Sequence, residues 1–117
     1  MSKTFTFNPH LFTPSQEYSD IYDHYNKKYF KHQLPVVRVG FYTDCERECG
    51  ATVRLYGAKH SSYIYLNNRL KTFDCYLRST LLHEMCHVKL ANRGGHGPKF
   101  KKELKRLMRL GAFDDIL

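Results

Sequence analysis

The sequence predicts an α+β fold in which one helix precedes a small sheet and two further helices follow it. Aromatic residues recur at helical spacing before residue 30, and short strand-like runs lie between residues 36 and 66. Two segments with helical apolar periodicity then complete the chain. A length of 117 residues is that of one domain. We expect residues 1–12 to form an irregular arm and residues 13–117 to form this domain.

The first helix is expected to begin at Thr13 and to continue to about Phe30. Thr13 can act as the N-cap, Pro14 suits the first helical position, and Gln16 completes a capping box. Apolar side chains then recur on one face of the helix, at Tyr18, Ile21, Tyr22, Tyr25 and Tyr29. We interpret this aromatic stripe as part of the core.

Three short strands are expected after Pro35. They cover residues 36–42, 50–56 and 62–66, and a turn region at 57–61 joins the last two. In the first strand Val37, Val39 and Phe41 would share one face, because side chains alternate along a strand. The three strands would make a small antiparallel or mixed sheet.

The next helix is expected at about residues 73–91, and it carries the pattern HExxH at residues 83–87. Thr72 or Asp74 is its expected N-cap, and Gly94-Gly95 its expected end. Because a helix turns by about 100° per residue, His83 and His87 lie within ~40° of each other and can reach one ion. Glu84 lies on the flank of this pair, where it can accept a proton from water.

Two residues compete to be the third metal ligand. His96 follows the paired glycines, and Glu103 lies in the last helix. The nine-residue step from His87 to His96 does not fit the metzincin pattern, in which the third His follows after six. We favour His96, because neutral imidazole suits zinc and a glycine-lined turn can direct the side chain backward. One Zn²⁺ per chain would then keep a fourth position open, as catalytic zinc sites do.

The last helix is expected to begin at Pro98 and is strongly basic. Its apolar stripe consists of Phe100, Leu104, Leu107 and Met108. Its basic residues are Lys99, Lys101, Lys102, Lys105, Arg106 and Arg109. With a net charge of +8, the chain favours anionic partners, and nucleic acid is the first choice for this set. A merely solvated helix face is an equally open interpretation.

The composition and the N-terminal residues indicate the cellular compartment and the redox state of the cysteines. The N-terminus lacks the apolar core of a signal peptide, and the chain contains no run of eighteen apolar residues. We therefore expect a cytoplasmic protein, nucleoid-associated or otherwise intracellular, that is not secreted. Its cysteines should be thiols, at Cys45, Cys49, Cys75 and Cys86. The lone CxxxC of Cys45 and Cys49 is more typical of buried thiols than of a zinc site, and Cys86 should pack in the helix.

Several of these motifs together resemble the SprT-like zinc metalloprotease domain over residues 15–108. They are Leu81–His87, His96–Phe100, Tyr29-Phe30 before Leu34-Pro35, and Cys49-Gly50-Ala51. The resemblance implies a zincin-like domain in a minimal single-domain form. It also implies that zinc is bound by three histidines and that the motif glutamate is the general base. In this sequence these residues are His83, His87, His96 and Glu84.

The same resemblance implies proteolysis near DNA, since the family includes proteases that degrade proteins crosslinked to DNA and so serve DNA repair. No cysteine follows Cys86, so a C-terminal zinc ribbon is not expected and any DNA contact would come from the domain itself. Two other functions stay open. One is a non-catalytic, zinc-stabilised DNA-binding domain. The other is a zinc hydrolase of small peptides or another acyl bond.

Overall fold

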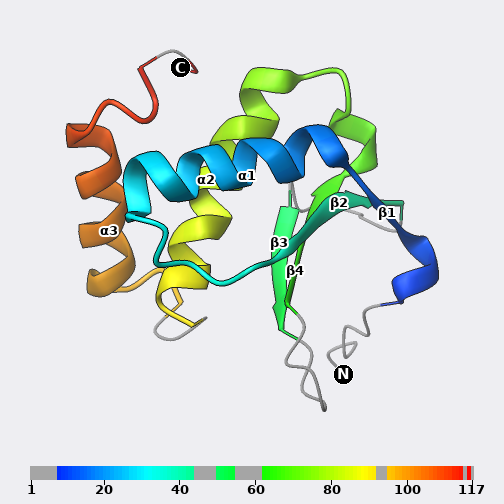
Figure 1. Cartoon of the computed structure of the whole chain (residues 1–117), viewed down its shortest axis with the longest axis horizontal. Coiled ribbons are helices and arrows are strands. Elements are labelled where there is room, and N and C mark those ends of the chain that lie inside the picture. Colours follow the sequence, from blue (N-terminus) through cyan, green and yellow to red (C-terminus); the bar gives the residue numbers. More distant parts are fainter. Residues whose placement is uncertain (1–7, 44–49, 55–61, 92–94, 115, 117) are drawn as a thin grey trace.

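The computed structural model describes residues 8–43, 50–54, 62–91, 95–114 and 116, and it has the predicted α+β architecture (Figure 1). Three α-helices accompany a small mixed sheet in this part of the chain. The helices are α1 (Gln16–Phe30), α2 (Asp74–Lys89) and α3 (Pro98–Arg109). The main strands are β2 (Arg38–Tyr42), β3 (Gly50–Arg54) and β4 (Ser62–Asn67). The predicted order of helix, three strands, helix and helix is confirmed.

The sheet is mixed, which was one of the two expected arrangements. Its strand order is β1-β2-β4-β3, where β1 is a three-residue strand at Phe12–Pro14. Strand β4 runs parallel to β2 and antiparallel to β3, while β1 pairs antiparallel with β2. Strand β4, the last strand in the sequence, therefore lies between β2 and β3, and β3 forms one edge of the sheet.

The beginning of the domain differs from the expectation. Thr13 and Pro14 belong to β1, and the N-cap of α1 is Ser15, whose Oγ accepts a hydrogen bond from the Tyr18 N–H at 3.2 Å. Residues 9–11 form a 3₁₀ helix, so the segment before Thr13 is not irregular throughout. Pairing with β2 outcompetes the local capping pattern, and Pro14 is tolerated because an edge strand can lack one N–H donor.

The core lies between the helices and one face of the sheet. As expected, the aromatic stripe of α1 is buried at Tyr18, Tyr22, Tyr25 and Tyr29, while Ile21 is partly buried. Val39 and Phe41 of β2 and Ile64 and Leu66 of β4 belong to the same cluster. On the opposite face of the sheet, the rings of Tyr42 and Tyr65 stack with their centroids 4.8 Å apart. The sheet therefore separates a large core from a small one.

The ends and faces of the later helices differ from the expectation in three respects. Neither Thr72 nor Asp74 caps α2, because Phe73 occupies the N-cap position without a side-chain hydrogen bond. Helix α2 ends at Lys89 and not at Gly94-Gly95, and Ala91 already adopts a positive φ of 53°. On α3, Met108 is half exposed and Glu103 is buried. The predicted start of α3 is confirmed, with Pro98 in its first turn.

Within the described residues, no helix combines the length and the apolar character that crossing a membrane requires.

Candidate metal centre

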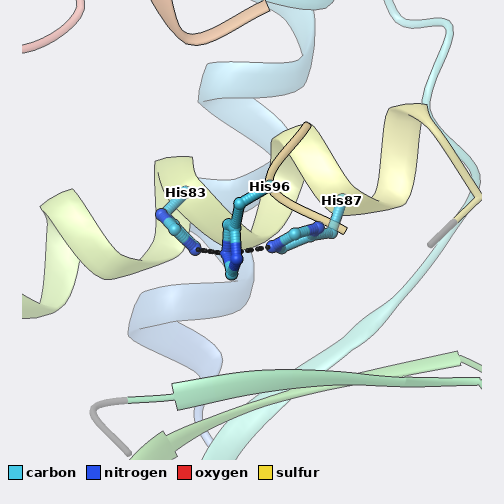
Figure 2. Close-up of side chains that lie close together, drawn as sticks. All are labelled: His83, His87 and His96. Carbon is cyan, nitrogen blue, oxygen red and sulfur yellow. Dashed lines mark hydrogen bonds between the residues drawn. The ribbon is translucent and has the colours of Figure 1, made fainter. Parts of the chain in front are cut away.

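Three histidines from two segments of the chain converge beside α2. His83 and His87 lie one turn apart on this helix, and His96 comes from the residues just before α3 (Figure 2). The Nε2 atom of His96 lies 3.2 Å from the Nε2 atoms of both His83 and His87. The candidate ligand atoms of the three residues all lie within 4.8 Å of one another. The structure thus brings together the three histidines singled out from the sequence.

The two nitrogen–nitrogen separations measured from His96 are compatible with binding of one metal ion. Two nitrogen atoms bound to one tetrahedral zinc at ~2.0–2.1 Å lie about 3.3 Å apart, close to the separations measured from His96. Each neutral imidazole carries a single N–H, and its other nitrogen presents a lone pair. Three such rings directed at one another are a donor set that suits zinc. His83, His87 and His96 could therefore hold a metal ion.

The protonation of two of these rings is also favourable for a metal. Burial lowers the pKa of His83, and the neighbouring charge of His96 lowers it further. Burial, followed by the charges of His83 and His96, lowers the pKa of His87 to about 4. Both imidazoles are therefore neutral at neutral pH, and neutral imidazole is the form that binds metals.

Glu84 lies next to this cluster without being part of it. Its side chain is buried, and its Oε2 atom is 3.9 Å from the Nε2 atom of His83. This separation is too long for a direct hydrogen bond between the two side chains. The Glu84 carboxylate therefore lies at the border of the histidine cluster.

Glu103, the alternative third ligand, is engaged elsewhere. Its carboxylate accepts hydrogen bonds from Lys89 Nζ at 2.8 Å and from Arg106 Nε at 2.7 Å. Burial alone would raise the pKa of Glu103, but the hydrogen bonds and charges of Arg106 and Lys89 outweigh burial and hold it below its ordinary value. Of the two candidates from the sequence, the structure brings His96 to the pair on α2.

Phe100 also borders the site. Sequence reasoning placed it in the apolar stripe of the last helix and in the His96–Phe100 motif of the family resemblance, but gave it no role at the metal centre. Its ring centroid lies 4.8 Å from that of His83, 4.6 Å from that of His87 and 4.9 Å from that of His96. The available signal was its position in the first turn of α3, four residues after His96.

The basic residues of α3 divide into two groups. Lys101, Lys102, Lys105 and Arg109 line, with Pro98 and Met108, a shallow hollow of about 690 Å³ on the outer face of the helix. Lys99 is exposed as well. Arg106 turns the other way, because it bonds Glu103, donates from Nη1 to the Tyr29 carbonyl at 2.7 Å and lies over the Phe30 ring. The exposed basic face of α3 therefore lacks Arg106.

The two cysteines in the described part of the chain, Cys75 and Cys86, do not belong to the histidine cluster. Cys86 is fully buried, as expected, and burial raises its pKa to about 12, so that it remains a thiol. Cys75 is an exposed thiol. The expectation for Cys45 and Cys49 stays a prediction, since both lie outside the described residues.

Comparison with known proteins agrees with this geometry. The SprT-like family matches residues 18–114, a range that holds nearly all of α1, the main strands of the sheet, α2, the three histidines and α3. None of the curated proteins matches the chain significantly. Members of this family carry a domain that resembles a zincin metallopeptidase. Because the match covers most of the 117 residues, the chain belongs to the SprT-like family.

Proposed function

We propose that this protein is a zinc-dependent metallopeptidase in which His83, His87 and His96 hold one Zn²⁺ per chain and Glu84 is the general base. The observation that carries the proposal is the convergence of three imidazole nitrogens with a buried carboxylate beside them. Membership of the SprT-like family supports the same reaction class. A purely structural zinc site has no use for a carboxylate in this position.

When bound, zinc would supply Lewis-acid chemistry by polarising the peptide carbonyl and making water more acidic. The carboxylate of Glu84 would take a proton from the attacking water as the new C–O bond forms. It would then deliver this proton to the amine nitrogen as the C–N bond breaks, which leaves a carboxylic acid and an amine. Burial and the contact with His83 favour this role, because they restrict the carboxylate to one side of the site.

An extended peptide would fit beside this site. The imidazoles of His83 and His87 extend from α2 on the side of the helix where Figure 2 draws the strands of the sheet. Strand β3 is the edge strand on one side of the sheet, opposite β1. Edge strands offer backbone donors and acceptors to an added strand, and such pairing reads the backbone more than the side chains. We therefore expect weak sequence preference.

We further propose that the substrates are proteins associated with DNA or crosslinked to it. The net charge of +8 and the exposed basic face of α3, formed by Lys99, Lys101, Lys102, Lys105 and Arg109, support this choice. A positive face raises the local concentration of a DNA-bound substrate and would hold it through phosphate contacts.

The proposal is tested by incubating the zinc-loaded protein with a basic DNA-binding protein, with and without single-stranded DNA. We expect cleavage that increases with DNA and that falls about 10²–10⁴-fold in Glu84→Gln, the usual contribution of a general base. Glu17→Gln, a change in the exposed first turn of α1, is the matched control and should cleave normally. Zinc binding and DNA binding without any cleavage would replace the proposal with a non-catalytic DNA-binding domain.

A further inference from the structure

We propose that Phe100 is a positioning residue of the metal centre, and that its ring holds the three imidazoles in the orientation that binds a metal. The inference rests on the proposed metal site, but it does not depend on which bond the protein cleaves. It concerns a side chain that has no ligand atom and would not touch the ion.

One phenyl ring packs against all three histidine rings. It stacks on the His87 ring, with an interplanar angle of 24°, and meets the rings of His83 and His96 nearly edge-on, at 61° and 89°. All three centroid distances fall at the short end of the 4.5–7 Å range that is typical of favourable aromatic pairs. Phe100 is only 4% exposed, so the ring is itself fixed by its surroundings. Rotation of any imidazole about its Cβ–Cγ bond would therefore disturb its contact with Phe100.

Orientation by packing is valuable here because the ligands come from separate segments. His83 and His87 belong to α2, whereas His96 precedes α3. Many zinc sites orient a histidine through a hydrogen bond to its second ring nitrogen. In the described part of the chain, the hydrogen bonds of these histidines involve Nε2 only. Contact with Phe100 would replace that hydrogen bond and would reduce the entropy lost when the rings converge on an ion.

The helix that carries Phe100 is anchored to its neighbours. Glu103 of α3 bonds Lys89 of α2, and it also bonds Arg106 of its own helix. Arg106 in turn donates to the carbonyl of Tyr29 in α1. These contacts hold α3 against both other helices, so the position of Phe100 relative to α2 is set by the fold and not by the metal.

The test compares Phe100→Leu with Leu107→Ala. Leu107 is fully buried and lies two turns, or about 10 Å, further along α3 than Phe100, so its truncation loosens the same helix at a distance from the site. Zinc affinity is measured by competition with a chromophoric chelator, and the melting temperature is measured on the metal-free proteins. Phe100→Met is a second variant that also keeps an apolar side chain, and it is used if Phe100→Leu does not fold.

We expect Phe100→Leu to weaken zinc binding by roughly tenfold or more, as the loss of groups that orient metal ligands commonly does. Leu107→Ala should lower the melting temperature at least as much and bind zinc like the original protein. Equal zinc affinity in Phe100→Leu and the original protein would overturn the inference, as would an equal loss in both variants. If the original protein itself bound no zinc, the proposed metal site would fail first, which distinguishes the two failures.

Discussion

At the scale of single residues, the positions of His96 and Glu103 determine which groups can complete the metal centre. Both were candidates for the third ligand, because spacing alone allows a turn or a following helix to return to α2. The charged neighbours of Glu103 resolve this ambiguity. Lys89 and Arg106 bind its carboxylate, which leaves His96 with its Nε2 atom 3.2 Å from each of the other two. The sequence contained both basic partners, but only the packing of α2 against α3 brings Lys89 to Glu103.

This assignment predicts opposite effects of two substitutions. His96→Ala should reduce zinc affinity by more than the ~10–100-fold that follows the loss of an outer-shell partner, because a direct ligand is removed. Glu103→Gln should still bind one zinc per chain. Zinc content after dialysis, measured by atomic absorption, distinguishes them. If His96→Ala retained zinc and Glu103→Gln lost it, Glu103 and not His96 would be the third ligand.

At the scale of secondary structure elements, the helices and the three main strands were predictable because each carries its own periodicity. The HExxH helix and the start of α3 at Pro98 could be predicted, because each depends on a local sequence pattern. Strand β1 was not, because Phe12–Pro14 becomes a strand only by pairing with β2. The burial of Glu103 and the exposure of Met108 were also missed. Helical spacing identifies a face, but the partner helices decide which residues at its margin are covered.

The junction of β1 and β2 depends on a missing side chain at Gly40. A Cβ atom there would lie 2.2 Å from the carbonyl oxygen of Thr13 and 2.7 Å from the Phe12 ring. Gly40→Ala should therefore push β1 away from the sheet and lower the free energy of unfolding by about 1–3 kcal/mol, the usual cost of overpacking. Urea denaturation monitors this loss. An unchanged unfolding midpoint would show that β1 can shift without cost.

The contact between α2 and α3 should depend on the charge of Glu103. Glu103→Gln weakens the bonds to Lys89 and Arg106 and should lower the free energy of unfolding by roughly 1–3 kcal/mol at neutral pH. The pKa of Glu103 is lower in the folded than in the unfolded chain, so its stabilising effect is complete above the unfolded value of ~4.3. It is lost as the pH falls through the folded value.

The difference in stability between the metal-free original protein and Glu103→Gln should consequently shrink in acid. Urea unfolding of the two proteins at neutral pH and at successively lower values below ~4 measures it. A difference that stays constant over this interval would mean that the carboxylate of Glu103 contributes through its shape and not through its charge.

At the scale of the whole molecule, the basic residues of α3 and the side chain that contacts the three histidines lie on different faces of that helix. Phe100 faces the histidines from the inner side of α3, whereas Lys101, Lys102, Lys105 and Arg109 line the outer hollow. Net charge was readable from the sequence, and so was the concentration of basic residues near the C-terminus. The inward orientation of Arg106 could not be predicted, because the sequence does not show which residue of a basic run has a buried hydrogen-bond partner.

Reversal of Lys101, Lys102 and Lys105 to Glu should therefore separate DNA binding from peptide hydrolysis. Loss of three phosphate contacts should reduce the slope of log affinity against log salt by about 2 for single-stranded DNA. Zinc binding and the cleavage of a short uncharged peptide should not change. Fluorescence anisotropy over a series of salt concentrations gives the slope. Undiminished DNA affinity would place the binding surface elsewhere.

We propose that His83, His87, His96 and Glu84 make this chain a metal-dependent peptidase. This proposal is tested most directly by titrating zinc into the metal-free protein while its cleavage of an unfolded protein substrate is followed. We predict that activity increases with zinc, reaches its plateau at one equivalent per chain, and falls about 10²–10⁴-fold in Glu84→Gln although this variant binds the same equivalent. Hydrolysis that is independent of zinc, or that Glu84→Gln leaves undiminished, would contradict a metal-dependent reaction in which Glu84 is the general base.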